Sequence, residues 1–219
     1  MIRVGLTGGI AAGKTVASGR FRELGITVLD YDQLARVVVE PGTAGLARVI
    51  AVFGEGVLTE DGHLNRSRLA GEVFADAEAR DQLEDIVHPL VIAEAQHLDD
   101  AALARGEAMI VHDVPLLVEA AGPEAFDVVI VIDAPPDVRA ERLIVGRGWT
   151  EAEAWGRINA QIDDDVRLEA ADVVFDGSGT ADNLRRQVDE WVADVTRKGA
   201  SYRPNVERTK FLVTEDGMP

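Results

Sequence analysis

The 219-residue chain contains no cysteine, which excludes disulfides and thiolate metal sites and is typical of a cytoplasmic protein. Long apolar runs are also missing, since none approaches the ~20 residues that a helix needs to cross a bilayer. The opening residues Met1–Val4 do not begin a secretion signal. Basic residues are in the minority, with 22 Lys and Arg against 39 Asp and Glu. We therefore expect neither nucleic acid nor a membrane as partner, because phosphate contacts need a basic face.

The residues that are present, 47% hydrophobic and 28% charged, suit a soluble globular domain. A β-branched run at 2–7, a helical pattern at 14–25 and a second apolar run at 26–30 predict a strand–helix–strand unit, and hence a parallel sheet. Further strands are predicted at 108–114, 126–133 and 171–176, with helices at 136–148, 150–161 and 181–197. The pattern predicts an α/β fold with about five parallel strands and helices on both faces.

Between residues 32 and 106 the pattern is mostly helical. A small hairpin or turn is expected at 57–65, with Asp61-Gly62 at its tip. Pro89 is predicted to be the first residue of a helix that ends at Gly106. We expect one domain over 1–200 and a loose tail over 201–219.

A glycine-rich segment joins the first strand to the first helix. Its spacing, Gly8-x-x-x-x-Gly13-Lys14-Thr15, is that of a phosphate-binding P-loop, in which successive amides and the helix N-terminus cradle phosphates. Lys14 would bridge the β- and γ-phosphates and the Thr15 hydroxyl would ligate Mg²⁺. A glycine-rich turn that matches by chance is the alternative. The predicted ATP-binding residues are Gly8, Gly9, Ile10, Ala11, Ala12, Gly13, Lys14, Thr15 and Val16.

Guanine is disfavoured as the base, because no asparagine is followed by lysine as in the Asn-Lys-x-Asp motif of GTPases. ATP is therefore the expected nucleotide.

Aspartates follow several predicted strands, at the edge of a parallel sheet where ligands bind. Asp32 could accept the proton of an acceptor hydroxyl, although Asp30 and Asp32 could also cap the next helix. Asp113 is a candidate to order Mg²⁺ through water. Asp133 competes for that role, with a turn former as its alternative.

Arginines gather in the predicted helices after residue 135. Arg139, Arg142, Arg147 and Arg167 could close over ATP as a lid, because guanidinium groups bind phosphoryl oxygens well. The alternative is solvated arginines paired with nearby acids such as Asp137, Glu141 and Glu151. The run Asp163-Asp164-Asp165 is typical of a solvated face.

The ordered set of motifs resembles the dephospho-CoA kinase family over roughly residues 1 to 195. The matching segments are GLTGGIAAGKT at 5–15, LDYDQLAR at 29–36, VVEPG at 38–42, DGHLNRSRL at 61–69, HPLV at 88–91, DVPLLVE at 113–119, AQ at 160–161 and AADVVFDGSG at 170–179.

This resemblance implies a three-layer P-loop nucleoside-kinase-like fold, with a helical acceptor-binding subdomain near 60–105 and a lid near 142–167. It implies Mg²⁺-dependent transfer of the ATP γ-phosphate to the ribose 3′-hydroxyl of dephospho-CoA, the last step of CoA synthesis. By position, Asp32 matches the family's base and Arg142 its transition-state arginine. The acceptor is expected at Arg66, His88, Pro115, Leu116 and Leu117.

The chain departs from the family at Ala11 and Ala12, where glycine and serine are usual, and at Asp163 and Asp164, where threonine and arginine are common. Another P-loop nucleoside or nucleotide monophosphate kinase is the alternative enzyme, and an ATP-switch protein is the alternative outside kinases. Nothing in the sequence specifies an oligomeric state.

Overall fold

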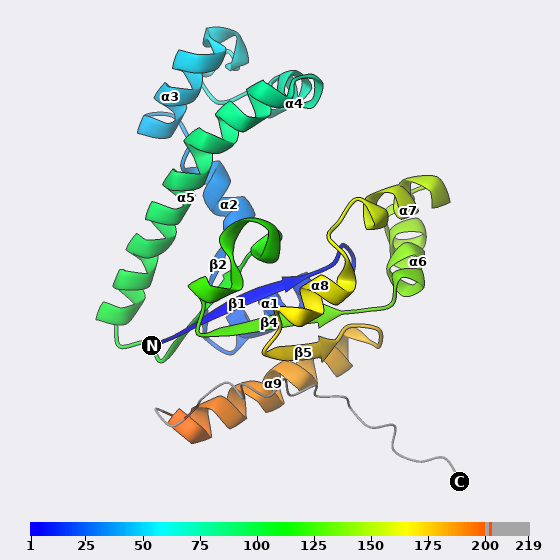
Figure 1. Ribbon diagram of the computed structural model, residues 1–219. Coiled ribbons are helices and arrows are strands. Elements are labelled where there is room, and N and C mark those ends of the chain that lie inside the picture. The colour runs from blue at the N-terminus through cyan, green and yellow to red at the C-terminus, as the bar shows by residue number, and fades with distance from the viewer. Residues whose placement is uncertain (200–201, 203–219) are drawn as a thin grey trace. The chain divides into compact units, whose positions relative to one another are not determined.

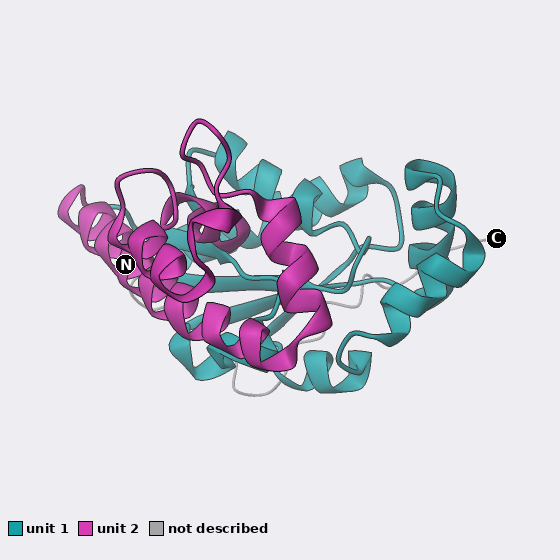
Figure 2. Cartoon of the chain, turned by 90° about the horizontal axis from the view of Figure 1, so that it is seen from above, with its two compact units in different colours: residues 1–28, 107–219 teal, residues 29–106 magenta. Residues whose placement is uncertain are grey.

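The computed structural model describes residues 1–199 and 202, so the predicted tail lies outside the described residues apart from Tyr202. The chain divides into two compact units, one made of residues 1–28 and 107–219 and the other of Leu29–Gly106 (Figure 2). Each unit has a core of its own and is described separately below.

The first unit is built around a five-stranded sheet in the order β2-β3-β1-β4-β5 (Figure 1). Its strands are β1 (Ile2–Gly8), β2 (Thr27–Asp30), β3 (Met109–Asp113), β4 (Val128–Asp133) and β5 (Val173–Asp176). β1 is central and pairs in parallel with both β3 and β4, and β4 pairs in parallel with β5. The predicted α/β fold with five strands is confirmed, and all carboxyl ends of these paired strands meet at one edge.

One face of the sheet is covered by α1 (Lys14–Glu23) and α9 (Ala181–Lys198). Alternate strand residues such as Val4 and Leu6 point to this face, where they join Phe21 of α1 and Trp191 of α9 in the main core. The two aromatic rings meet edge to face with centroids 6.0 Å apart. This packing holds α1 against the sheet.

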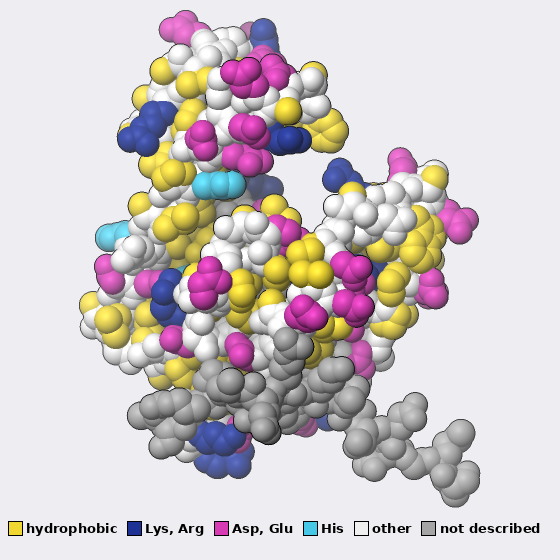
Figure 3. Space-filling model, in the orientation of Figure 1, with side chains coloured by type: hydrophobic (Ala, Val, Ile, Leu, Met, Phe, Trp, Pro, Cys, Tyr) yellow, Lys and Arg dark blue, Asp and Glu magenta, His cyan; other side chains and the backbone are white. Residues whose placement is uncertain are grey.

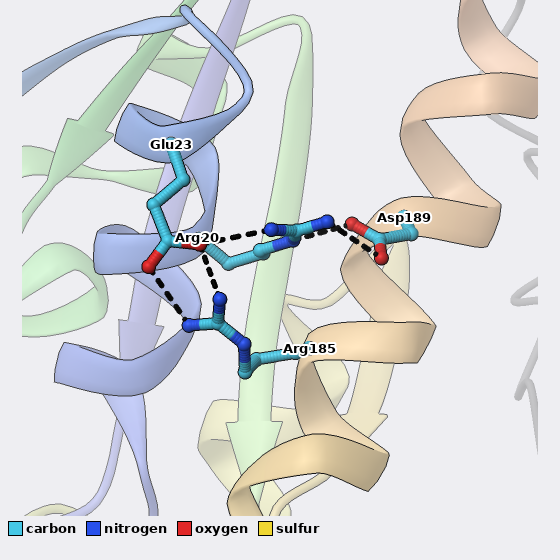
Figure 4. Close-up of polar contacts among 4 residues, drawn as sticks. All are labelled: Arg20, Glu23, Arg185 and Asp189. Carbon is cyan, nitrogen blue, oxygen red and sulfur yellow. Dashed lines mark hydrogen bonds and ion pairs between the residues drawn. The ribbon is translucent and has the colours of Figure 1, made fainter.

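Polar contacts on the surface join the same two helices (Figure 4). The Arg20 guanidinium binds Asp189 through two hydrogen bonds of 2.6 and 2.9 Å and also contacts Glu23, which accepts from Arg185 as well. Hydrogen bonds from Arg185 and then Arg20 lower the pKa of Glu23 to about 2. The network therefore keeps its charges down to acidic pH.

The opposite face of the sheet carries α8 (Asp164–Glu169), which packs on β4, and a short helical turn at Leu117–Ala121. Position 5, in β1, requires glycine, because the side chains of Leu117 and Phe126 fill the adjacent space. A Cβ on Gly5 would lie only 2.6 and 2.7 Å from them. α6 (Pro136–Arg147) and α7 (Glu151–Asn159) pack on each other after β4 (Figure 1). Helices thus cover both faces, as expected.

The second unit consists mainly of α2 (Tyr31–Val37), α3 (Ala44–Phe53), α4 (Arg66–Ala75) and α5 (Ala77–Ala104). The long helix α5 packs against the other three helices, around a core of Val39, Val49, Val57 and Leu69. The predicted turn at 57–65 is confirmed, since Leu58 and Leu64 form an antiparallel bridge and Gly62 has a positive φ of 81°.

The prediction that Pro89 begins a helix is wrong. The Asp76 carboxylate caps α5 by accepting from Glu78 N at 2.9 Å, and Pro89 lies in the middle of this 28-residue helix. A proline there leaves the carbonyl of Asp85 without its helical donor. The helix continues because residues on both sides of the proline are packed: Ile86 is partly buried against the core of the unit, and Val91 is buried. The predicted end at Gly106 is confirmed by its positive φ of 75°.

Acidic side chains are spread over the face of the molecule shown in Figure 3. Among the residues described, basic side chains on that face form small separate groups rather than one continuous patch. None of the helices in the described part of the chain is both long and apolar enough to cross a membrane.

Candidate active site

The glycine-rich segment lies between β1 and α1, where the sequence predicted the phosphate cradle. Gly13 caps α1 with a left-handed φ of 118°, so a side chain is disfavoured there. Gly8 is confined by β4, since a Cβ on it would lie 2.6 Å from the carbonyl oxygen of Ile132. Ala11 also has a positive φ, 60°, which is strained for a residue with a Cβ. The segment is thus a tightly turned loop whose next residues, Lys14 and Thr15, open the helix.

Lys14 reaches the end of the neighbouring strand β3. Its ammonium forms an ion pair and hydrogen bond with Asp113, whose side chain is almost fully buried. The Thr15 side chain lies in the first turn of α1, and the residue is exposed. Lysine, hydroxyl and carboxylate are therefore gathered at the carboxyl edge of the sheet, which is the chemistry a nucleotide phosphate site requires.

The two aspartates predicted as candidates for the Mg²⁺ role have different contacts in the structure. Asp113 contacts Lys14, whereas the main-chain oxygen of Asp133 accepts from Gly177 N at 2.6 Å. Burial raises the pKa of Asp133, and the nearby charge of Asp164 adds to that effect. Asp113 is the carboxylate that lies beside the loop's lysine.

Arg142 of α6 binds the back of the loop. Its Nη1 atom donates to the carbonyl oxygens of Ala11 and Ala12 at 3.1 and 3.3 Å. Its Nη2 atom donates to the carbonyl oxygens of Ser178 and Gly179 at 3.1 and 3.0 Å. One guanidinium therefore joins the loop to the segment between β5 and α9.

Two other predicted lid arginines are buried. Arg139 and Arg167 both pair with Asp164, with 2% and 4% of their surfaces exposed. The prediction of solvated arginines fails for these two residues, and the prediction of a solvated acidic run fails for Asp164. Asp163 instead caps α8 by accepting from Asp165 N at 3.0 Å.

Arg147, the remaining lid arginine, is exposed near the end of α6, with its guanidinium carbon 5.8 Å from the centre of the Trp149 ring. Gln161, which follows α7, belongs to the AQ motif at 160–161. Its Oε1 accepts from Ile10 N of the loop at 2.8 Å. The predicted lid segment is therefore bonded to the loop near both of its ends.

The candidate acceptor residues of the second unit lie on α2, α4 and α5. Asp30 is the N-cap of α2, accepting from Gln33 N at 3.0 Å, so its capping interpretation is confirmed. Asp32, in the first turn of α2, is exposed. Arg66 donates to the carbonyl oxygen of Arg36 at 3.3 Å, and His88 is exposed on α5.

The candidate acceptor residues of the first unit follow β3. Leu116 is 55% exposed, whereas Leu117 is fully buried against Gly5. The carbonyl oxygen of Pro115 accepts from the Thr7 hydroxyl at 3.3 Å. Of the three residues, only Leu116 presents a largely exposed side chain.

The family model described as dephospho-CoA kinase matches residues 2–183. A dephospho-CoA kinase of Cutibacterium acnes is 47% identical over 190 residues, which cover 86% of this chain and 82% of that protein. One from Streptomyces avermitilis is 44% identical over 198 residues, covering 90% and 96%.

Solved structures give the same fold. The protein TT1252 of Thermus thermophilus matches with a TM-score of 0.71 and 29% identity, over 89% of this chain and 97% of that one. Dephospho-CoA kinase from Campylobacter jejuni matches with a TM-score of 0.67 and 22% identity, over 89% and 97%. The loop between β1 and α1, the five parallel strands and these matches agree: the chain belongs to the dephospho-CoA kinase family.

Proposed function

We propose that this chain transfers the γ-phosphoryl group of ATP to the ribose 3′-hydroxyl of dephospho-CoA, giving CoA and ADP. The bond from the γ-phosphorus to the acceptor oxygen forms as the bond to the β-phosphate oxygen breaks. The hydroxyl proton passes to a carboxylate. The observation that carries the proposal is the pairing of Lys14 with Asp113 at the loop, in a chain that matches the family over residues 2–183.

The loop from Gly8 to Val16 is the proposed ATP site. Its main-chain amides and the N-terminus of α1 favour anionic phosphates, and Lys14 would exchange Asp113 for the β- and γ-phosphate oxygens. This exchange is favourable because the phosphates carry more negative charge than one carboxylate.

Mg²⁺ fits this site. In the described part of the chain, no three His, Asp or Glu side chains are grouped to hold a metal by themselves. A magnesium ion that accompanies a nucleotide needs only one or two protein oxygens, the rest being phosphate and water. Thr15 and Asp113 offer a hydroxyl and a carboxylate for this purpose. When bound, the ion would neutralise charge on the β- and γ-phosphates.

The acceptor is proposed to be bound by Asp32, Arg66 and His88 of the second unit, together with the segment Pro115–Leu117. Asp32 is exposed and so is open to accept the hydroxyl proton. Arg66 and His88 carry the polar groups suited to the phosphates and ribose of the acceptor.

Arg142 is the proposed transition-state arginine, and Arg139, Arg147 and Arg167 are the proposed lid cations. The Arg142 guanidinium already lies at the nucleotide loop, bound to the carbonyls of Ala11 and Ala12. The segment 142–167 is proposed to close over ATP and exclude water, which would prevent transfer to solvent.

The test is transfer of labelled γ-phosphate to dephospho-CoA, AMP, CMP and shikimate in parallel, with mass spectrometry of the products. We expect one phosphoryl group added to dephospho-CoA and little turnover of the others. Lys14→Ala should abolish transfer, and Lys198→Ala, which removes an exposed lysine of α9, should not. Turnover confined to a nucleoside monophosphate, or ATP hydrolysis without a phosphorylated acceptor, would overturn the proposal.

A further inference from the structure

The guanidinium of Arg139 is buried with incomplete hydrogen bonding. Its Nη2 atom donates to Asp164, whereas its Nε and Nη1 atoms have no hydrogen-bond partner among the described residues. Asp164 also accepts from Arg167, so one carboxylate serves two buried guanidinium groups. A buried charge is retained against a substantial desolvation cost. The ion pair with Asp164 alone therefore does not explain why Arg139 is buried here.

Arg139 lies directly against the nucleotide loop. A Cβ on Gly9 would collide with its Nη1 atom and would lie 3.1 Å from its Cζ atom. Gly9 thus leaves the space that the guanidinium occupies. The next residue of the loop, Ile10, donates its N–H to Gln161, which follows α7. The guanidinium is consequently fixed at the side of a loop whose amides bind anions.

We propose that Arg139 is a positioning residue that adds a buried positive charge to the phosphate site, in addition to the charge of Lys14. Asp164 holds the Arg139 guanidinium against Gly9, and its negative charge lowers the positive potential that this guanidinium produces at the loop. The reduction follows from distance, because a carboxylate bonded to both guanidinium groups offsets part of their potential at the loop. The ligand concerned is the polyphosphate of the nucleotide.

The inference rests on the proposed function only in requiring that the loop binds nucleotide phosphates. Failure of the wild-type chain to bind MgATP would overturn both. Binding by the wild-type chain that does not respond to the changes below would overturn this inference alone.

The sharpest test uses the three consecutive aspartates. Asp164→Asn keeps an oxygen that can accept from a guanidinium but removes the negative charge, so MgATP and MgADP should bind several-fold more tightly in calorimetry. Asp165→Asn is the matched control, because Asp165 is exposed and has no ion pair in the described structure; it should leave both affinities unchanged. The KM for dephospho-CoA should change in neither variant. Unchanged or weaker nucleotide binding by Asp164→Asn would overturn the inference.

A second pair of variants tests charge against packing. Arg139→Gln should weaken MgATP and MgADP binding by about tenfold, and Arg139→Lys should recover most of that loss. Equal losses in both variants would show that the guanidinium only fills space, and the inference would then be wrong. If Arg139→Gln fails to fold, as its thermal unfolding would reveal, the comparison of Asp164→Asn with Asp165→Asn decides by itself.

Discussion

Replacing Ala11 by glycine should stabilise the protein, although it removes a side chain. Ala11 has a φ of 60°, and it is the only residue other than glycine with a positive φ in the described part of the chain. Left-handed backbone costs a residue with a Cβ roughly 1–2 kcal/mol. Glycine removes that cost but adds roughly 0.5–1 kcal/mol of conformational entropy lost on folding. The net gain in the free energy of unfolding is at most about 0.5–1 kcal/mol, because the Ala11 methyl group also packs against the α6–α7 cluster.

The neighbouring alanine provides the control. Ala12 is 1% exposed and packs in the main core, so Ala12→Gly loses a buried methyl group and gains no relief of strain. We expect it to destabilise the protein by about 1.5 kcal/mol, from about 0.8 for the buried carbon and the rest from backbone entropy. Arg142 holds the carbonyls of both alanines, so the two variants are compared at equally fixed positions.

The assay is thermal unfolding of both variants and the wild-type chain, without nucleotide. The two variants should differ by about 2 kcal/mol, which for a chain of this size corresponds to about 4–8 °C in Tm. The reasoning is refuted if Ala11→Gly lowers the Tm as much as Ala12→Gly does. In that case the left-handed backbone of the loop would not be strained by the Ala11 side chain.

Other variants test the chemistry and the ion balance. Asp32→Asn should lower kcat by about 10²-fold or more while leaving the KM for MgATP nearly unchanged, and near-full turnover would remove Asp32 as the base. Arg142→Ala should lower kcat and also reduce the free energy of unfolding by at least about 2 kcal/mol, because four carbonyl oxygens lose a charged donor; an unchanged Tm would contradict this. Burial, and then the charge of Arg3, lowers the pKa of His112 to about 4, below its ordinary 6.5. The buried imidazole is neutral, so its contribution to stability is fully present above pH 6.5. Up to about 3 kcal/mol of the free energy of unfolding should be lost as the pH falls from 6.5 to 4. Urea unfolding across this range should show a smaller loss in His112→Asn than in the wild-type chain.

The local features of the fold could be predicted because each is contained within a few neighbouring residues. The turn from β1 into α1 needs only the spacing of Gly8, Gly13 and Lys14. The choice between Asp113 and Asp133 could not be made in this way, because β3 and β4 both flank β1 and end at the same edge. Only the reach of the Lys14 side chain distinguishes them.

The contacts made within the predicted lid segment could not be predicted from the sequence either. Asp164 stands in a run of three aspartates that differ only in the direction their side chains take once α8 is folded on β4. Periodicity carries no information on such a direction in a six-residue helix. The prediction of a helix start at Pro89 failed for a related reason. Proline is common at the first residue of a helix, but here packing on both sides keeps α5 helical through it.

The contacts of Arg142 have a consequence for how this chain can vary. Arg142 precedes α7 and α8 along the chain, and Ser178 and Gly179 come after them, yet one side chain joins these positions to each other and to the loop. The stretch from Arg142 to Ser178 therefore leaves the loop and returns to it, and the Arg142 hydrogen bonds connect its two ends. An insertion or deletion around α7 would then change the length of this stretch away from its joined ends. Related kinases could therefore differ in length here without a change in the glycine-rich turn.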